Sequence, residues 1–467
     1  SGVYTAYEYL ERRFDAKTRS LTAFLFLLSR GMSCGTIIAA PGVVFSAIFG
    51  IPLAWSVAMI GIPTVLYTMV GGVQAVAWAD VKQMVLIVVA LLAIVVVLIF
   101  QMPVNPHDAL QIAGATGRLK TFDFSFNMNE TYTFWSGVIG GTFLMLSYFG
   151  TDQSQVQRYL TATSLKDSRL SLIFNAFLKV PMQVLILSIG VLLFVFYHFE
   201  EPPLVFSPAE VAAVEESDRA ADFRVLEEEK AAVHASRRAA TLELLDARSR
   251  GEIVAEGQRV IEGYDRRLQD LRSEAKGIVE DVRGTASNDV NYVFPTYIIS
   301  FIPTGLLGIL IAVIFAAAMS SLDSEITALS SASVMDFYRR FFKPGATDAH
   351  YLLVSRFTTL FWGLFAFCVA LYAGQMGSLI EAVNQIGSFF YGSLLGVFLL
   401  AFFVPRASGT GASVGLLAGM ASVFVVSLTT DISWLYYNVV GAGVVFLIGS
   451  LLWRETGGGP SGETPGA

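Results

Sequence analysis

A run of hydroxyl-bearing residues lies inside one strongly apolar stretch of this sequence, AAAMSSLDSEITALSS, residues 316–331. The helical spacing i, i+3, i+4 and i+7 places four residues on one face of this stretch, namely Ala317, Ser320, Ser321 and Ser324. We call this face the polar seam, and Asp323 lies beside it. Hydroxyl oxygens near a carboxylate are hard ligands of the kind that bind Na⁺. The same small residues also suit a close helix–helix contact, and the stripe alone leaves both interpretations open.

Four further ionisable residues stand in or beside apolar segments: Arg30, Asp80, Asp152 and Lys179. Each suits a structural ion pair as well as a functional site, because a charge at membrane depth needs either a partner or a role. Lys179 lies roughly ten residues into its apolar segment, too deep to reach the membrane surface easily, which favours a cavity role. Together with the polar seam, these residues indicate a polar pathway through a membrane.

The composition defines a polytopic, all-α membrane protein. Hydrophobic residues make up 54% of the 467 residues and charged residues only 15%. Apolar runs near the roughly 20 residues that span a bilayer recur ten times, at about 20–49, 52–71, 76–101, 132–152, 169–197, 295–332, 351–374, 377–404, 409–428 and 432–453. We therefore expect membrane helices over 1–197 and 295–453, in contact with the lipid bilayer.

Basic residues predict the orientation, because cytoplasmic loops are enriched in Lys and Arg. If the N-terminal loop is cytoplasmic, that side carries Arg12, Arg13, Lys17, Arg19, Lys82, Arg158, Lys166, Arg169, Arg339, Arg340, Lys343, Arg406 and Arg454. The opposite side has only Arg118 and Lys120 outside one long insert. Both ends of this chain are then expected to be cytoplasmic, with the protein in the plasma membrane, as in a bacterial inner membrane.

The long insert, 198–294, is acidic and helical in character. Between 198 and 292 it holds 21 acidic and 13 basic residues, a balance of −8, whereas the rest of the chain is nearly neutral. A break at 249–251 separates two helical stretches, and the second has an apolar seam at Val260, Tyr264, Leu268, Leu271, Ala275, Ile278 and Val282. We expect an external antiparallel hairpin, either a solvated spacer or a docking surface for a partner or another copy.

Several functions are excluded or disfavoured by what the sequence contains. No Walker A pattern is present, so this chain does not itself use ATP, and no organic cofactor is expected. All four His residues lie outside the polar seam, which gives a membrane-embedded enzyme no support. The acidic insert on a neutral body makes nucleic acid an unlikely partner. The Gly- and Pro-rich end, 454–467, is expected to be disordered.

Five segments in one order resemble signatures of the sodium:solute symporter family. They are GGVQAVAWADVKQ at 71–83, GTDQSQVQRYL at 150–160, FLK at 177–179, the stretch from FPTYIISF to DFYRR at 294–340, and LLGVFLLAFFVPR at 394–406. The resemblance covers the membrane body but not the acidic insert. It implies a LeuT-like core of ten helices in two inverted repeats of five, with substrate and Na⁺ near the midplane.

By this resemblance the first span here is the third core helix, and the seam helix is the eighth. Residues 1–197 then hold core helices three to seven, and 295–453 hold core helices eight to ten plus two more. The first two core helices are missing, so we expect the sequence to lack its N-terminal part.

The resemblance also implies site residues. The family's sodium site would use the carbonyl of Ala317 and the hydroxyls of Ser320 and Ser321. A second site would use Asp80 with Ser320 and Ser324. Asp323 replaces a small or hydroxyl residue of the family, which implies a second ion or a changed proton or ion preference.

For the substrate, the resemblance implies Tyr148 as an aromatic gate, Lys179 as a polar contact, and Asn384 or Gln385 as hydrogen-bond partners. The whole then predicts a sodium-coupled symporter that imports a small organic solute, of the sugar or the carboxylate and anion class, by alternating access. A transporter-like sensor that binds solute without flux is the alternative.

Overall fold

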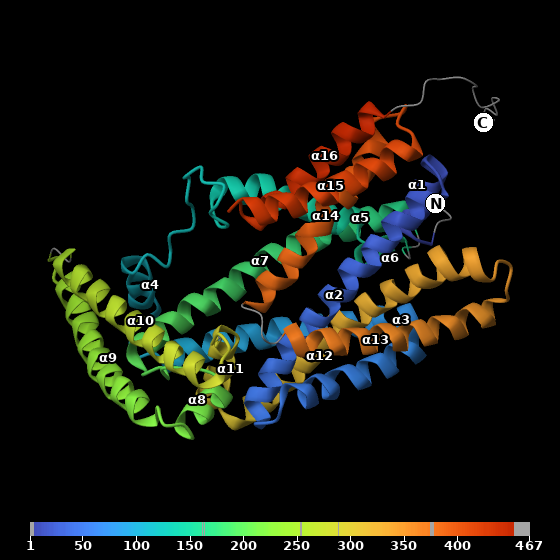
Figure 1. The fold of residues 1–467 in the computed structure, drawn as a ribbon. Coiled ribbons are helices and arrows are strands. Elements are labelled where there is room, and N and C mark those ends of the chain that lie inside the picture. The colour runs from blue at the N-terminus through green and yellow to red at the C-terminus, as the bar shows by residue number, and fades with distance from the viewer. Residues whose placement is uncertain are drawn as a thin grey trace.

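The structure is a computed structural model that describes residues 4–160, 162, 164–252, 255–287, 289–373 and 378–452, without the side chains of 72–77. Over these residues the chain is helical and has no strand. Long helices lie alongside one another in one bundle, and two helices project from one end of it (Figure 1). This confirms the predicted all-α membrane body with a helical hairpin. The predicted disordered tail, 454–467, lies outside the described residues.

The helices of the bundle are α1 (Ala6–Arg13), α2 (Ala16–Phe49), α3 (Leu53–Gln101), α4 (Pro106–Ala115), α5 (Thr142–Thr151), α6 (Gln153–Leu160), α7 (Leu165–Phe199), α11 (Val293–Phe301), α12 (Thr304–Ala332), α13 (Asp348–Ala373), α14 (Leu379–Phe403), α15 (Gly409–Thr429) and α16 (Tyr437–Leu451). Shorter turns of π or 3₁₀ helix are η1 (Ser136–Gly141), η2 (Val290–Tyr292), η3 (Ser333–Phe342) and η4 (Trp434–Tyr436). The insert contains α8 (Pro208–Glu215), α9 (Ala220–Ser249) and α10 (Ala255–Arg283).

Nine segments among the described residues are long and apolar enough to cross a membrane. Two of them, Leu53–Gly71 and Trp78–Gln101, lie within the bounds of α3. The remaining predicted span, 132–152, forms η1 and α5, which are too short to count among the nine. A ten-residue α-helix rises only about 15 Å, so this segment depends on its packed neighbours at membrane depth.

Local sequence explains several helix boundaries. The Asp15 carboxylate accepts a hydrogen bond from the backbone N–H of Thr18 at 2.8 Å, which caps the start of α2. The same helix ends at Gly50, whose φ of 62° lies in the left-handed region that favours glycine. Pro52 and Pro303 immediately precede α3 and α12, where a missing N–H costs no intrahelical bond.

The last three spans pack closely through glycine. An added Cβ at Gly392 of α14 would lie 2.5 Å from the Cα of Asn438 on α16, and at Gly419 of α15 it would lie 2.9 Å from the carbonyl oxygen of Gly441. Small residues at such positions let helix backbones approach closely in membrane proteins. This tight group anchors α14, which faces α2 and α5 at the centre of the bundle.

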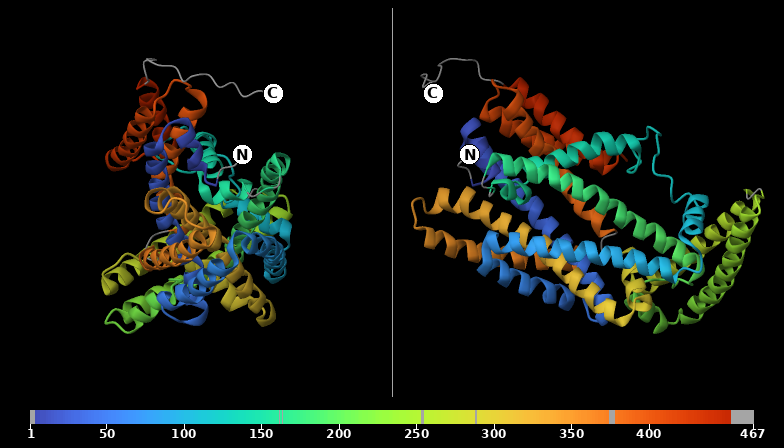
Figure 2. Two further views of the ribbon diagram at one scale, coloured as in Figure 1. Left: turned by 90° about the vertical axis from the view of Figure 1, so that its right-hand side faces the viewer. Right: turned by 180° about the vertical axis from the view of Figure 1, so that it is seen from behind.

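The hairpin lies at the end of the bundle away from α1 and from the C-terminal end of α16 (Figures 1 and 2). It has an apolar core of its own in which Leu271, Ala275 and Ile278 are buried, as the predicted seam requires. The prediction for α10 is wrong at its first residue, because Val260 is 45% exposed and its neighbour Ile261 is buried instead. The turn of the hairpin holds Gly251 at a φ of 76°.

The hairpin is bonded to the end of α7. The carbonyl oxygen of Tyr197 accepts a hydrogen bond from Arg237 Nη2 at 2.6 Å and lies 3.2 Å from Nε2 of His234. Lys230 Nζ donates to the carbonyl of Pro202 at 2.8 Å. Arg237 and His234 thereby satisfy a carbonyl that the end of α7 leaves free, and a cation there also favours the helix dipole. The hairpin is therefore firmly attached, in contrast to a loose spacer.

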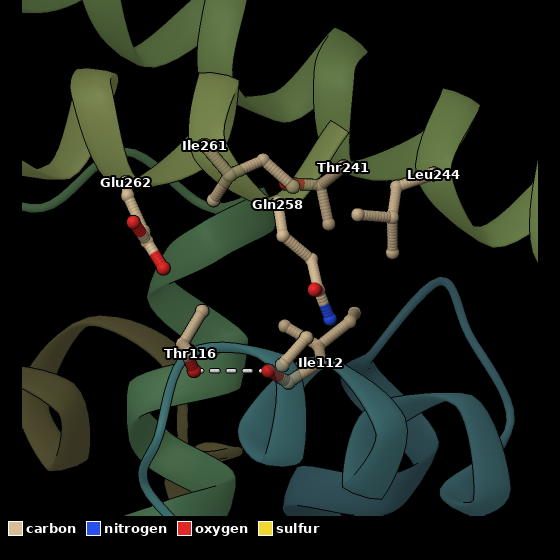
Figure 3. Close-up of a pocket in the computed structure, with 8 residues that line it drawn as sticks. Ile112, Thr116, Thr241, Leu244, Gln258, Ile261 and Glu262 are labelled. Carbon is tan, nitrogen blue, oxygen red and sulfur yellow. Dashed lines mark hydrogen bonds between the residues drawn. The ribbon is translucent and has the colours of Figure 1, made fainter. Parts of the chain in front are cut away.

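A second attachment joins the hairpin to α4. Thr241, Leu244, Gln258 and Ile261 from α9 and α10 face Ile112 and Thr116 across a narrow gap (Figure 3). The gap holds only about 10 Å³, close to the space of one water. A third attachment runs through the buried Asp289, which accepts from the backbone N–H of Phe206 and pairs with Arg272 and Lys276, each at 2.8 Å.

Candidate functional site

The polar seam on α12 faces α3 and α6. Ser320 Oγ donates a hydrogen bond to Asp80 Oδ1 across the interface between α12 and α3. Arg158 of α6 contacts both helices, because its Nη2 lies 3.2 Å from Asp80 Oδ2 on α3 and also donates to Ser324 Oγ on α12. Three helices thus meet at one set of oxygen atoms. We call Asp80, Arg158, Ser320, Asp323 and Ser324 the seam cluster.

Asp323 adds a second carboxylate to the seam cluster. Its side chain is fully buried, and Oδ1 accepts from Ser324 Oγ at 3.3 Å. Its other oxygen, Oδ2, has no hydrogen-bond partner, and among the described residues no cation pairs with it. Two carboxylates with one guanidinium carry a net charge of −1, and buried uncompensated charge is costly. A small hard cation would reduce that cost, and the hydroxyl and carboxylate oxygens fit Na⁺.

Fewer residues of the first predicted sodium site take part in the seam cluster. Ser320 belongs to the seam cluster, whereas Ala317 is half-buried and Ser321 is exposed. The structure therefore brings together the residues of the second predicted set, Asp80 with Ser320 and Ser324. No group of three or more His, Cys, Asp and Glu side chains in the part of the chain described is placed to hold a metal ion.

A second polar centre lies around Arg30 in the middle of α2. Its Nη2 lies 2.7 Å from Asp152 Oδ2, and its Nε lies 3.0 Å from Glu325 Oε2. All three side chains are nearly inaccessible, with exposures of 2% for Arg30, 2% for Asp152 and 5% for Glu325. The guanidinium also lies 5.2 Å from the ring centroid of Tyr148 and 5.6 Å from that of Tyr391. Desolvated guanidinium–ring contacts of this kind are stabilising.

Sequence reasoning found Arg30 and Asp152 but missed Glu325 and Tyr391. A signal for Glu325 was present, because it is a second carboxylate in the apolar stretch two residues after Asp323. Nothing in the sequence singled out Tyr391, which is one of many aromatic residues in apolar segments.

Short helix α6 links the two centres. Asp152 immediately precedes it and accepts hydrogen bonds from Ser154 N at 2.9 Å and Ser154 Oγ at 2.7 Å. One turn further on, Gln157 Nε2 donates to the carbonyl of Ser324 at 3.1 Å. The carboxylate that pairs with Arg30 therefore lies at the start of the same short helix that carries the guanidinium bound to Asp80.

The predicted substrate residues fall into two groups. Tyr148 and Lys179 lie together, since Lys179 Nζ is 5.9 Å from the Tyr148 ring centroid and 4.7 Å from that of Phe149. The side chain of Lys179 is exposed in this structure, although the residue lies well inside α7. Asn384 donates to the carbonyl of Ile380 in its own helix at 2.8 Å, and Gln385 is exposed. The place of Asn384 and Gln385 in a substrate site therefore stays a prediction.

These features define a class of protein before any comparison. A helical membrane bundle that holds charged side chains between its spans, next to a broken helical segment, is typical of a membrane transporter. The chain belongs to the sodium:solute symporter family, whose sequence profile matches residues 1–223 and 272–419. The internal unmatched stretch, 224–271, lies within the insert, whereas the profile also matches 198–223 and 272–294, which the resemblance did not cover.

Individual relatives agree with this assignment. The chain is 27% identical to the sodium-dependent multivitamin transporter of Oryctolagus cuniculus over 90% of its length and 54% of the relative. It is 27% identical to the sodium-coupled monocarboxylate transporter 1 of Homo sapiens, covering 90% of this chain and 56% of that one. The chain is 24% identical to the sodium/sialic acid symporter NanT of Aliivibrio fischeri, and the match covers 96% of this chain and 73% of that protein. The chain spans about half the length of the first two relatives.

A solved structure shares the fold. A Na⁺-coupled sialic acid symporter, described as substrate-bound and outward-open with a novel Na⁺-site, superposes with a TM-score of 0.70. The identity is 22%, and the match covers 96% of this chain and 76% of that one. This confirms the LeuT-like fold. The relatives are transporters rather than enzymes, and neither the sensor alternative nor self-association through the hairpin has support among them.

Proposed function

We propose that this protein is a sodium-coupled symporter that imports a small organic solute, of the sugar or the carboxylate and anion class, by alternating access. The observation that carries the proposal is the seam cluster, where two carboxylates and two hydroxyls from α3 and α12, with the guanidinium of Arg158 from α6, carry a net charge of −1. Na⁺ would bind these oxygens and hold the two helices together. Solute would bind beside Tyr148 and Lys179.

The coupling follows from linkage. If Na⁺ and solute favour the same conformation, each tightens the binding of the other by the same factor. Moving one positive charge inward across about 100 mV supplies roughly 2.3 kcal/mol, which supports accumulation of nearly fiftyfold. The solutes named for relatives, which are vitamins, monocarboxylates and sialic acid, define the first panel to test.

We place the protein in the plasma membrane, as in a bacterial inner membrane, with both ends of this chain cytoplasmic and the hairpin outside. The basic residues near α1 and at Arg406 support this orientation. Labelling of a cysteine introduced at the hairpin turn with a membrane-impermeant reagent, in intact cells, would test it.

The full-length protein in proteoliposomes tests the function. Solute uptake is measured with and without an inward Na⁺ gradient, for wild type, Ser320→Ala and Ser321→Ala. Na⁺-driven accumulation that is lost in both variants supports a site shared by the two hydroxyls, and loss in Ser320→Ala alone places the ion at the seam cluster. Uptake indifferent to Na⁺ would refute the sodium assignment, and solute binding without flux would favour the sensor.

A further inference from the structure

The ion pairs around Arg30 lie between the proposed sodium site and the proposed solute site. We call Arg30, Asp152 and Glu325 the buried trio. Glu325 directly follows Ser324, a member of the seam cluster, in the sequence of α12. On the other side, the Arg30 guanidinium lies 5.2 Å from the ring centroid of Tyr148. One guanidinium therefore separates a neighbour of the proposed sodium ligands from the proposed solute gate.

Two carboxylates from different elements fix the plane of this guanidinium. Nη2 of Arg30 lies 2.7 Å from Oδ2 of Asp152, and Nε lies 3.0 Å from Oε2 of Glu325 on α12. A guanidinium is planar and its donors have fixed directions, so its orientation depends on where both carboxylates lie. Helix α2, which carries Arg30, packs against both α12 and α14 (Figure 1). A shift of α12 relative to α2 therefore turns or displaces the guanidinium.

Tyr148 lies between the buried trio and Lys179. Its side chain is half-buried, and Nζ of Lys179 lies 5.9 Å from the ring centroid. The Tyr148 hydroxyl accepts a hydrogen bond from Nε2 of Gln155 at 2.8 Å. Protein interiors are close-packed, so a guanidinium that moves must also move the ring that lies against it. The position of Tyr148 beside the proposed solute site thus depends on Arg30.

Sodium at the seam cluster would fix the position of α12 against α3. Consecutive side chains of an α-helix diverge by about 100°, so Ser324 contacts Arg158 of α6 while Glu325 contacts Arg30 of α2. Both residues stand on the same helical turn. A shift that brings Ser324 to a bound ion therefore carries Glu325 with it.

We propose that Arg30 is a positioning residue, which transmits sodium binding at the seam cluster to Tyr148 through Glu325. This inference rests on the proposed function. With Na⁺ bound, α12 is held against α3, Glu325 holds the guanidinium, and the Tyr148 ring is fixed where solute binds beside it. Without Na⁺, α12 is less constrained and the ring loses that support. Asp152 stays on Arg30 in both arrangements, so the buried guanidinium always keeps a counter-charge.

A second route between the two sites runs through α6. Nε2 of Gln157 donates to the carbonyl of Ser324 at 3.1 Å, and α6 begins directly after Asp152. The route through Arg30 is the more direct of the two, because the guanidinium itself contacts the Tyr148 ring. The two routes use different side chains, so substitutions separate them.

Fluorine NMR of the full-length protein in detergent tests the proposal, with 3-fluorotyrosine introduced at position 148. NaCl replaces choline chloride at constant ionic strength and constant pH, and no solute is needed. In the otherwise wild-type protein, we expect the resonance to shift with Na⁺. The midpoint of that shift should equal the midpoint of the Na⁺-induced rise in thermal stability, which is measured on the same samples.

Glu325→Gln breaks the link at α12 and leaves Asp152 to pair with Arg30. Most of the Na⁺-dependent shift should be lost in this variant, while Na⁺ still stabilises the protein against heat. Arg30→Lys keeps the charge balance of the buried trio but loses the planar fork, and it should also lose the shift. The matched control is Glu228→Gln, at an exposed position of α9, which should respond like wild type.

The outcomes separate this inference from the proposed function. If Na⁺ changes neither the resonance nor the thermal stability, the sodium site itself is refuted, and the link with it. If Na⁺ stabilises the protein but the shift persists in both Glu325→Gln and Arg30→Lys, only the link is overturned. A shift that persists in those variants and is lost in Gln157→Leu would assign the transmission to α6 instead.

Discussion

Ser320 on α12 donates a hydrogen bond to Asp80 on α3, and this contact joins residues 240 positions apart in the chain. Among the described side chains, it is the one hydrogen bond between the polar seam and α3. Arg158 closes the group from α6. A cation that replaces this hydrogen bond by direct coordination would bind two helices at once, so its affinity depends on their relative position.

The first prediction concerns this contact. Asp80→Asn should lower Na⁺ affinity by at least about tenfold, because the variant loses a charged ligand while keeping the size of the side chain. Na⁺-induced stabilisation of the purified protein, measured as the shift of the thermal unfolding midpoint against Na⁺ concentration, reports the affinity. Ser422→Ala removes a hydroxyl that only bonds the Gly419 carbonyl within α15, and it should leave the titration unchanged. An unaltered titration in Asp80→Asn would contradict the proposed site.

The second prediction concerns stability. Arg30→Met should lower the free energy of unfolding by about 3–5 kcal/mol, because it leaves Asp152 and Glu325 buried and unpaired. Glu325→Gln should cost much less, since one carboxylate then remains for one guanidinium. Chemical denaturation in detergent measures both.

A surface residue provides the control for this comparison. Arg12 pairs with Glu8 at 3.0 Å, but its side chain is 56% exposed. Arg12→Gln should therefore change stability by less than about 1 kcal/mol. If Arg30→Met were equally mild, the buried trio would not stabilise the fold.

The membrane spans and the polar seam could be predicted because both depend on local sequence, whereas the pairing of Asp80 with the seam came from the family resemblance and the contribution of Arg158 was missed. Apolar runs identify spans, and the helical period places Ser320 and Ser324 on one face. The partners around Arg30 could not be predicted in this way. Glu325 lies 295 positions away, and only the packing of α2 against α12 brings the two together.

The attachment of the hairpin shows the same limit. The apolar period of α10 predicts which side is buried within the hairpin, but it does not say where the hairpin folds back. The sequence does not distinguish Arg237 and His234 from the other polar residues of a charged helix. Their role appears only when α9 lies across the end of α7 and meets the free carbonyl of Tyr197.

The third prediction tests the close packing of the last spans. Gly392→Ala should destabilise the protein by about 1–3 kcal/mol, because the new methyl group would overlap the backbone of Asn438. Gly443→Ala is the matched control, since nothing lies within 4 Å of an added Cβ there. That variant should be neutral or up to about 1 kcal/mol more stable, because alanine favours the helix. Thermal unfolding of both variants decides the point, and equal midpoints would contradict the packing of α14 on α16.

The fourth prediction is a pH dependence at the hairpin attachment. Burial lowers the pKa of His234, and the neighbouring Arg237 and Lys230 lower it further, outweighing the Tyr197 carbonyl and Glu201, which raise it. When the hairpin detaches, the pKa of His234 returns to its ordinary value of about 6.5. The detached state then binds the proton more tightly, so this contribution to attachment is fully present above about pH 6.5 and is lost as the pH falls towards the lower pKa of the attached state.

Hydrogen–deuterium exchange of α9 and the end of α7 in the full-length protein measures this effect, after correction for the intrinsic pH dependence of exchange. The proton that His234 takes up should lower protection at the attachment below pH 6.5 by at most about tenfold per pH unit. His234→Gln should flatten that dependence, whereas His107→Gln, at an exposed position of α4, should retain it. A wild-type profile that stays level from pH 7.5 to pH 5 would show that His234 does not link protonation to the attachment.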